Sequence, residues 1–588
     1  MTDPPGTSRS ETRRPGAAGL VLSHGPAVAA YVALTVAFYW PAVAHISSRA
    51  LSDGLDGASF LWGDWAIPRA VLHLHNPFLT HQIFFPVGVD TALHTNTALW
   101  AMVSWPLARL FGLGQAATIL GLFAVAASGV AAYALATHVT GERWAGFVAG
   151  TAFTILPYRY GRAVAHHNLN HTELLPLGLL AMVLLYEAPT RRRALALGGV
   201  FGATLLTDIT YSLFLLIAAV VLAAVRWRQT WTRLLGLRWA QAGAVAALIA
   251  SPLLLAILAA LGRQELDPLP AWGGADSSSS DLLSWVIPPV THPWWGSSLR
   301  HVATTVSQGE RVSYVGMVML LLAVAGMLVG RRRAPWGALA GVFGVLALGP
   351  FLHVDGTTGS GFSYLGSKFA VPLPYLAIHF VPVLNGLRNP ARFSVVAALA
   401  LDVLAAMAIA RLLRRSRRLG VLAAAAAVAA TVIEFLPGSL IPLQPVAVPR
   451  AYDAITASHP GAVLEIPMQW RDGFLRVGDS PAGRDDTIFL YYATRHGRPV
   501  VSGMVARLPH SRLVALERHP VLRQILALQG EPGFAGPVSL DATQLRRAGI
   551  GYVVYHRDRP VPPVLSWLNT SRLPVAADDG TVVVFAVP

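Results

Sequence analysis

Two carboxylates, Asp53 and Asp56, follow the first long apolar segment of the chain in the stretch LSDGLDGASFLWGDW. An exposed carboxylate can accept a proton from an incoming hydroxyl group, or it can help to hold a divalent cation. The two residues are three positions apart, which is close enough to share one site. The alternative is a loop turn, because Asp-Gly pairs are typical of turns.

A second polar cluster lies between two apolar segments, in the stretch PYRYGRAVAHHNLNHTE. Its side chains that could bind a substrate, a phosphate or a metal are Arg159, Arg162, His166, His167, His171 and Glu173. His167 and His171 are four apart and would share a helix face, so with Glu173, or with an aspartate such as Asp56, they form a candidate metal site. The alternative is an amphipathic interfacial helix with its polar side in water.

Arg388 and Arg392 are four residues apart in LNGLRNPARF, just before another apolar segment. Pro390 between them fits the start of a helix. A planar guanidinium group suits phosphate oxygens, so this pair is a candidate phosphate site. The alternative is a pair of arginines that reach to lipid headgroups.

The composition indicates what class of protein holds these residues in place. Of the 588 residues, 54% are hydrophobic and 13% are charged, against about 25% charged in an ordinary soluble domain. The net charge of +15 comes from arginine clusters between apolar blocks, which favours membrane topology over nucleic-acid binding. The absence of cysteine excludes disulfides and thiolate metal sites.

Apolar blocks long enough for membrane helices recur along the chain. They lie near 26–45, 114–137, 143–157, 172–187, 238–261, 312–330, 335–352, 391–411 and 419–436. The stretch 194–225 is interrupted at Asp208 and predicts two short helices with a tight turn. The block 98–112 is ambiguous because Trp105-Pro106 breaks it, so we expect eleven spans, with twelve as the alternative.

The arginine clusters set the expected orientation, because cytoplasmic loops are rich in basic residues. Residues 1–20 would be a disordered basic cytoplasmic tail, and 21–438 a transmembrane domain with outer loops at 46–113 and 262–311. Residues 439–588 would be an extracytoplasmic α/β domain, with buried strands at 462–467, 551–556 and 581–587. Asp208 and Asp402 are costly at membrane depth and are therefore expected to be paired, protonated or functional.

This layout resembles the GT-C superfamily of polytopic membrane glycosyltransferases, in an uncharacterised bacterial branch. The stretches that carry the resemblance are SDGLDGASFLW, NPFLTHQIFFPVGVD, LPYRYGRAVAHHNLNHTELLPL, LNGLRNPARF and YYATRHGRPVVSGMVAR. The resemblance implies a sugar donor linked to polyprenyl phosphate, a glycan, lipid or protein acceptor, and a bacterial plasma membrane. Asp53 or Asp56 would be the base of a hexosyl- or pentosyltransferase, and an arginine, with Mg²⁺ or Mn²⁺ left open as a cofactor, would stabilise the leaving phosphate.

Two other functions fit the same sequence. One is a transporter or flippase of lipid-linked or polar solutes, although its polar residues would gather near the bilayer midplane rather than at one surface. The other is a non-catalytic protein of cell-envelope assembly.

Overall fold

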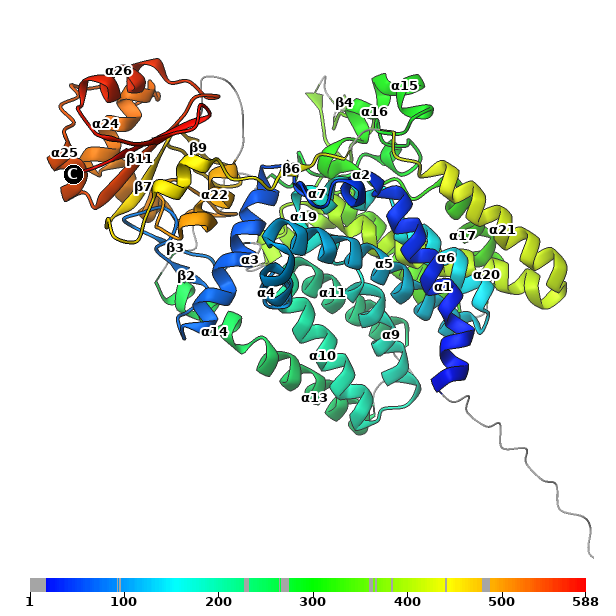
Figure 1. The fold of residues 1–588 in the computed structure, drawn as a ribbon. Helices are drawn as coiled ribbons and strands as arrows, with labels where there is room; N and C mark the ends of the chain where they lie inside the picture. The colour runs from blue at the N-terminus through cyan, green and yellow to red at the C-terminus, as the bar shows by residue number, and fades with distance from the viewer. Residues whose placement is uncertain are drawn as a thin grey trace, which may run out of the picture.

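The structure is a computed structural model that describes residues 17–588 with short gaps. The gaps are residues 93, 95–96, 227–231, 264, 266–273, 331, 359–362, 365–366, 382–383, 439–440 and 479–486. Packed helices form the body of the molecule, and a C-terminal α/β domain lies at one end of it (Figure 1). Positions 1–16 of the expected basic tail fall outside the described residues, and the first helix begins at Ala17.

Every predicted apolar block contains a helix of the body. These helices are α1 (Ala17–Phe38), α5 (Leu113–Thr140), α6 (Arg143–Thr154), α9 (Leu174–Glu187), α10 (Arg191–Thr207), α11 (Ile209–Val225), α13 (Arg233–Ile249), α14 (Ser251–Gly262), α17 (Met317–Val329), α18 (Ala334–Ala347), α20 (Ser394–Arg415) and α21 (Arg417–Glu434). Several of them start where a side-chain oxygen accepts a backbone N–H three residues on, as at Thr190, Asp208 and Ser416. The predicted turn at Asp208 is confirmed.

Two helical stretches of the described chain, α5 and Pro390–Arg415, are long and apolar enough to cross a bilayer, and α13 with α14, bent by 75°, would make a third. Six more apolar helices have 10–17 residues. A helix of 14 residues reaches about 21 Å, which is short of the roughly 30 Å of hydrocarbon in a bilayer. The apolar helices make this a membrane protein, and the count of eleven or twelve spans stays a prediction.

The block at 98–112 differs from its prediction. α4 (Ala98–Phe111) continues through Pro106 without a break. A proline inside a helix removes one hydrogen bond, and here the turns on both sides remain helical. The expected break at Trp105-Pro106 is therefore wrong.

The segments between these helices fold into short elements. They are α2 (Trp40–Ala44), α3 (Asp56–Leu72), α7 (Tyr158–Ala165), α8 (His167–Asn170), η1 (Leu282–Trp285), α15 (Trp295–Ser298), α16 (Arg300–Val306), η2 (Gly309–Arg311), α19 (Tyr375–His379), η3 (Leu384–Gly386), η4 (Pro390–Phe393), β1 (Arg49–Ala50), β2 (Leu79–Thr80), β3 (Val89–Asp90), β4 (Ser363–Tyr364), β5 (Ser367–Lys368) and β6 (Gln444–Pro445). In Figure 1, α7, α15, α16 and β4 lie along the upper side of the body, the side on which the α/β domain stands.

The C-terminal domain contains a four-stranded sheet in the order β12-β13-β11-β7. Its strands are β7 (Ala462–Ile466), β11 (Ile550–His556), β12 (Val575–Asp578) and β13 (Val582–Ala586). β7 and β11 are parallel, and β13 is antiparallel to β11. The three predicted strands are therefore confirmed, and their continuous burial explains why they read as apolar runs.

A smaller sheet and several helices complete the domain. The sheet has the order β10-β8-β9. These elements are β8 (Trp470–Arg471), β9 (Arg476–Val477), β10 (Gly503–Met504), η5 (Arg450–Ala454), α22 (Ile488–His496), α23 (His510–Glu517), α24 (Pro520–Gln529), α25 (Ala542–Arg547) and α26 (Pro562–Thr570).

The segment 46–113, which the sequence predicts to be an outer loop, packs into the C-terminal domain. The Val500 N–H donates to the Gln82 carbonyl at 2.9 Å, and the Phe85 N–H donates to the Val500 carbonyl at 3.1 Å. Phe84 and Trp62 of the loop pack in the domain's hydrophobic core. Loop and domain, which are far apart in the sequence, therefore form one packed unit beside α3 (Figure 1).

Candidate functional site

The start of α3 is pressed against α7. A Cβ at Gly57 would lie 2.4 Å from the Val164 carbonyl oxygen, so a side chain there would push the two helices apart. The Asp53 N–H donates to the same carbonyl at 3.2 Å. This contact places Asp56, the first residue of α3, beside His166, with 3.5 Å between Oδ2 of Asp56 and Nε2 of His166.

The two aspartates have different surroundings. Oδ1 of Asp53 accepts the N–H groups of Leu55 and Gly57 at 2.9 and 3.0 Å, which fixes the loop that leads into α3. Burial raises the pKa of Asp53 to about 6, with Asp56 adding to the rise and the backbone N–H groups opposing it. The Asp56 side chain is 36% exposed and faces a histidine, so it is the aspartate open to an incoming group.

Glu310 of η2 lies at the centre of the charged cluster. Its carboxylate accepts Nε and Nη2 of Arg392, both at 3.1 Å, in a two-pronged ion pair. Arg162 of α7 donates to the same carboxylate at 3.1 Å, and Nε2 of His166 lies 3.7 Å away. Segments near 160, 310 and 390 therefore converge on one carboxylate.

The charge state of this cluster follows from its arrangement. Burial alone would raise the pKa of Glu310, but Arg392 and Arg162 hold it well below its usual range. Burial lowers the pKa of His166, while Glu310 and Asp56 act in the opposite direction. Glu310 is thus a carboxylate already neutralised by arginines, and its structural role was not foreseen from the sequence.

Arg388 has a different environment from its neighbour in sequence. Its guanidinium group packs against Gly473, where a Cβ would lie 2.0 Å from Nη1, and over the Phe474 ring at 4.8 Å. Nη1 is buried and has no hydrogen-bond partner in the described structure. Burial lowers the pKa of Arg388 to about 10, with Arg392 and Arg507 lowering it and Asp472 and Asp56 raising it. Arg388 therefore has an unused donor, whereas Arg392 is bonded to Glu310.

Three of the predicted residues hold the 158–173 segment together. Arg159 is 1% exposed and donates to the Asn170 carbonyl at 2.8 Å and to Thr172. Nδ1 of His171 is 2.9 Å from Oε1 of Glu173, and its ring stacks on Trp100 with 4.1 Å between centroids. The alternative of an interfacial helix with its polar side in water is wrong, because that side faces the protein interior.

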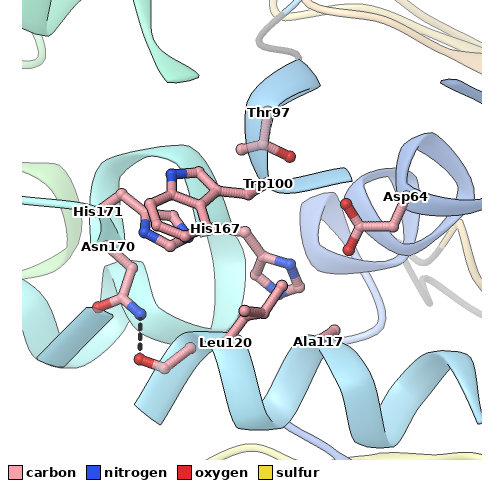
Figure 2. Close-up of a pocket in the computed structure, with 9 residues that line it drawn as sticks. Asp64, Thr97, Trp100, Ala117, Leu120, His167, Asn170 and His171 are labelled. Atoms are coloured by element: carbon pink, nitrogen blue, oxygen red, sulfur yellow. Dashed lines mark hydrogen bonds between the residues drawn. The ribbon is translucent and has the colours of Figure 1, made fainter. Parts of the chain in front are cut away.

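His167 lines a small cavity that also touches Asp64, Thr97 and Trp100 (Figure 2). Its volume of ≈ 20 Å³ has room for about one water molecule but not for a sugar. Burial raises the pKa of Asp64 to about 7 and lowers that of His167 to about 4, so a neutral histidine faces a carboxyl group that titrates near neutrality. Nε2 of His167 bonds the Leu51 carbonyl at 3.1 Å.

The suggested metal ligands do not converge. Asp56 faces His166, whereas His167 and His171 point into the cavity of Figure 2, where His171 is already bonded to Glu173. Among the described residues no three histidine, aspartate or glutamate side chains are grouped as metal ligands. The proposed Asp56–His167–His171 set therefore does not fit a metal ion.

The two aspartates within the helical body differ. Asp208 is 4% exposed and accepts the Tyr211 N–H at 2.8 Å as well as the Asn168 side chain, which ties α11 to the 158–173 segment. Asp402 is buried in α20, and its Oδ2 has no hydrogen-bond partner within the described part of the chain. Asp208 is therefore hydrogen-bonded inside the protein, while no arginine of the described residues pairs with Asp402.

Solved structures of similar fold are membrane glycosyltransferases. The chain aligns over 96% of its length with the arabinofuranosyltransferase AftD from Mycobacteria, at a TM-score of 0.56 and 15% identity. It aligns over 90% of its length with the Archaeoglobus fulgidus oligosaccharyltransferase in complex with Zn and sulfate, at 0.51 and 12%. The alignments cover 40% and 68% of those chains, so this chain spans about two fifths of the length of AftD.

These likenesses show a fold of the GT-C type, as the sequence resemblance implied. No curated protein sequence matches the chain. A family model matches residues 27–432, which include α3, α7, η2 and η4 and therefore the charged cluster. The chain belongs to the family described as Domain of unknown function (DUF6311), and its fold is that of the GT-C membrane glycosyltransferases.

Proposed function

We propose that this protein transfers a sugar from a polyprenyl-phosphate donor to an acceptor hydroxyl group at the outer surface of the bacterial plasma membrane. The observation that carries the proposal is an open carboxylate, Asp56, within electrostatic range of Arg388, which has an unused buried donor. Sugar transfer by direct displacement needs a base on one side of the anomeric carbon and a cation on the other.

Asp56 is the base in this proposal. It accepts the proton of the acceptor hydroxyl as the oxygen attacks the anomeric carbon, and His166 at 3.5 Å orients the carboxylate. Asp53 is assigned to loop structure, because one of its oxygens is already bonded to two backbone N–H groups.

Arg388 is the phosphate ligand. As the bond between the anomeric carbon and the phosphate oxygen breaks, the phosphate keeps the electron pair and gains negative charge, which the free guanidinium donor stabilises. Arg392 and Arg162 both donate to Glu310, so we assign them to holding the loops of the site together. Of the predicted pair, only Arg388 keeps the phosphate-binding assignment.

The proposed orientation places the N-terminus in the cytoplasm and the C-terminal domain outside. The arginine-rich turns, such as Arg191–Arg193, then face the cytoplasm, as the bias of basic residues in such loops requires. α7, which carries Arg162 of the charged cluster, lies on the same side of the body as the α/β domain (Figure 1), which agrees with one reacting surface. A reporter fused after Pro588 that is active only outside the cytoplasm tests this orientation.

The test of function is release of polyprenyl phosphate by the full chain in nanodiscs. Undecaprenyl-phosphate donors carrying pentoses or hexoses are offered with an envelope glycan extract, and undecaprenyl phosphate is measured by mass spectrometry. We expect acceptor-dependent release that Asp56→Asn lowers about 100-fold or more. Glu142→Gln, in an exposed ion pair with Arg417, is the matched control. Release that is equal in the Asp56→Asn protein contradicts the assignment.

A further inference from the structure

Two arginines make contacts between the helical body and the C-terminal domain. Arg388, in the loop before α20, packs on Gly473 and Phe474 of the domain. Arg507, which belongs to the domain, packs in the opposite direction, since a Cβ at Gly386 would lie 2.9 Å from its Nη2. Arg507 thus lies against a glycine of the loop that carries Arg388, and Arg388 lies against Gly473, whose N–H donates to the Ala506 carbonyl next to Arg507 at 3.2 Å.

The charge of Asp472 acts on both arginines, but its carboxylate already accepts backbone N–H groups. Oδ1 of Asp472 accepts the N–H groups of Phe474 and Leu475, both at 2.7 Å, and Oδ2 accepts the Leu508 N–H at 3.1 Å. Asp472 lowers the repulsion between the arginines by its charge. It forms no ion pair with either arginine that would satisfy Nη1 of Arg388.

Two like charges brought together on glycines, with a buried donor left unbonded, are costly unless an anion binds between them. The carboxylate of the C-terminal domain at this place, Asp472, is already bonded to backbone N–H groups. The arrangement is therefore typical of a site that an anionic ligand completes, and the nearby Asp56 marks where the reacting centre lies.

We propose that Arg507 of the C-terminal domain binds the donor phosphate together with Arg388, so that the phosphate is held between the two parts of the chain. This inference rests on the proposed function and extends it, because the domain becomes part of the substrate site. The donor phosphodiester carries one negative charge, and the released phosphomonoester carries close to two. A second guanidinium group stabilises the additional charge as the bond to the sugar breaks.

The shared ligand chemistry is a phosphate, which could belong to a lipid or be free in solution. The probe is radiolabelled undecaprenyl phosphate, with undecaprenol as the uncharged probe and inorganic phosphate as competitor. Binding to the full chain in nanodiscs is measured for the wild type, Arg388→Gln and Arg507→Gln. Arg523→Gln, an exposed arginine on α24 of the same domain, is the matched control.

We expect Arg507→Gln to weaken the binding of undecaprenyl phosphate about tenfold, with Arg523→Gln and undecaprenol binding unchanged. Normal binding by Arg507→Gln, with weak binding by Arg388→Gln, overturns this inference and leaves the proposed function in place. Equal binding of undecaprenyl phosphate and undecaprenol by the wild type overturns both. Displacement by millimolar inorganic phosphate overturns the assignment to a lipid phosphate.

Arg507→Lys covers the case in which the glutamine variant does not fold. Lysine keeps the charge but lacks the planar fork that binds two oxygens at once, so we expect a loss of about threefold. Wild-type affinity in the Arg507→Lys protein overturns a contact in which two N–H groups of Arg507 bind two phosphate oxygens. Thermal unfolding without ligand checks that each variant is folded.

Discussion

Two of the carboxylate–histidine pairs in the described structure differ in their surroundings, one at the charged cluster and one inside the C-terminal domain. In the domain, Nε2 of His556 is 2.8 Å from Oε2 of Glu465, and the Tyr452 hydroxyl donates to the same carboxylate at 2.9 Å. Both members of this pair are at most 3% exposed. The Asp56–His166 pair is looser, at 3.5 Å, and its side chains are 36% and 20% exposed.

The difference shows what makes such a pair available for chemistry. Glu465 has its bonds completed by Tyr452 and His556 within the sheet, at the ends of the parallel strands β7 and β11. Asp56 retains access to solvent and lies near Arg388, which has an unused donor. The same residue types thus stabilise a core in one place and form a candidate site in the other.

The largest expected contrast is in activity. Asp56→Asn should lower transfer about 100-fold or more, because it removes the proton acceptor. Glu465→Gln should leave transfer within about twofold, because that carboxylate is sealed in the domain. Release of undecaprenyl phosphate, measured at equal amounts of folded protein, checks both. A larger loss in Glu465→Gln than in Asp56→Asn would reverse the comparison.

The next effect is on stability. Glu310→Gln leaves Arg162 and Arg392, which are 4% and 7% exposed, without their carboxylate, so we expect a loss of about 3 kcal/mol in the free energy of unfolding. The midpoint of thermal unfolding in detergent measures it. Glu142→Gln, whose partner Arg417 is 62% exposed, should change the midpoint little. An unchanged midpoint in Glu310→Gln would mean that the cluster does not hold the loops together.

A smaller loss of stability is expected when the buried hydrogen bonds among Tyr452, Glu465 and His556 are changed. Tyr452→Phe removes one hydrogen-bond donor from Glu465 and should cost about 1 kcal/mol, while Glu465→Gln should cost about 2 kcal/mol. Thermal unfolding of the two variants gives the ranking. If both unfold at the wild-type temperature, the network contributes nothing to the fold.

The smallest expected effect is a dependence of stability on pH that comes from Asp53. The pKa of Asp53 is raised to about 6 in the folded protein, above the value of 3.8 for the free group. The protonated form is therefore favoured by folding, so its contribution to stability is complete below about pH 4 and is lost as the pH rises through 6. Asp53→Asn should flatten this part of the curve of unfolding temperature against pH. An identical curve for variant and wild type would contradict the burial of Asp53.

Much of the fold could be predicted from the sequence. Apolar blocks such as 114–137 and 391–411 marked helices, because continuous hydrophobicity of that length is typical of membrane segments. The strands at 462–467 and 551–556 were recognisable as short apolar runs. The helix through Pro106 was missed, because local rules overestimate how often proline ends a helix when the surrounding packing supports it.

The site was predicted in part. Asp56, His166, Arg388 and Arg392 were singled out by type and spacing, and the structure brings them to one region. Glu310 was overlooked, although an acidic residue next to an arginine in the short polar stretch QGERVSY was a usable signal. The expected grouping of His167 and His171 with Asp56 failed, because helix periodicity does not show which side faces the protein interior.

The sequence by itself determined the membrane class, the positions of the helices, the strands of the α/β domain and the short list of charged residues. These depend on local hydrophobicity and residue type, which the chain states directly. Only the tertiary structure decided which arginine is neutralised and which keeps a free donor. It also decided that Arg507 lies beside Arg388. Such pairings arise between distant segments, 82 residues apart for Arg392 and Glu310 and 148 for Arg162 and Glu310, and their geometry is set by packing of the whole molecule.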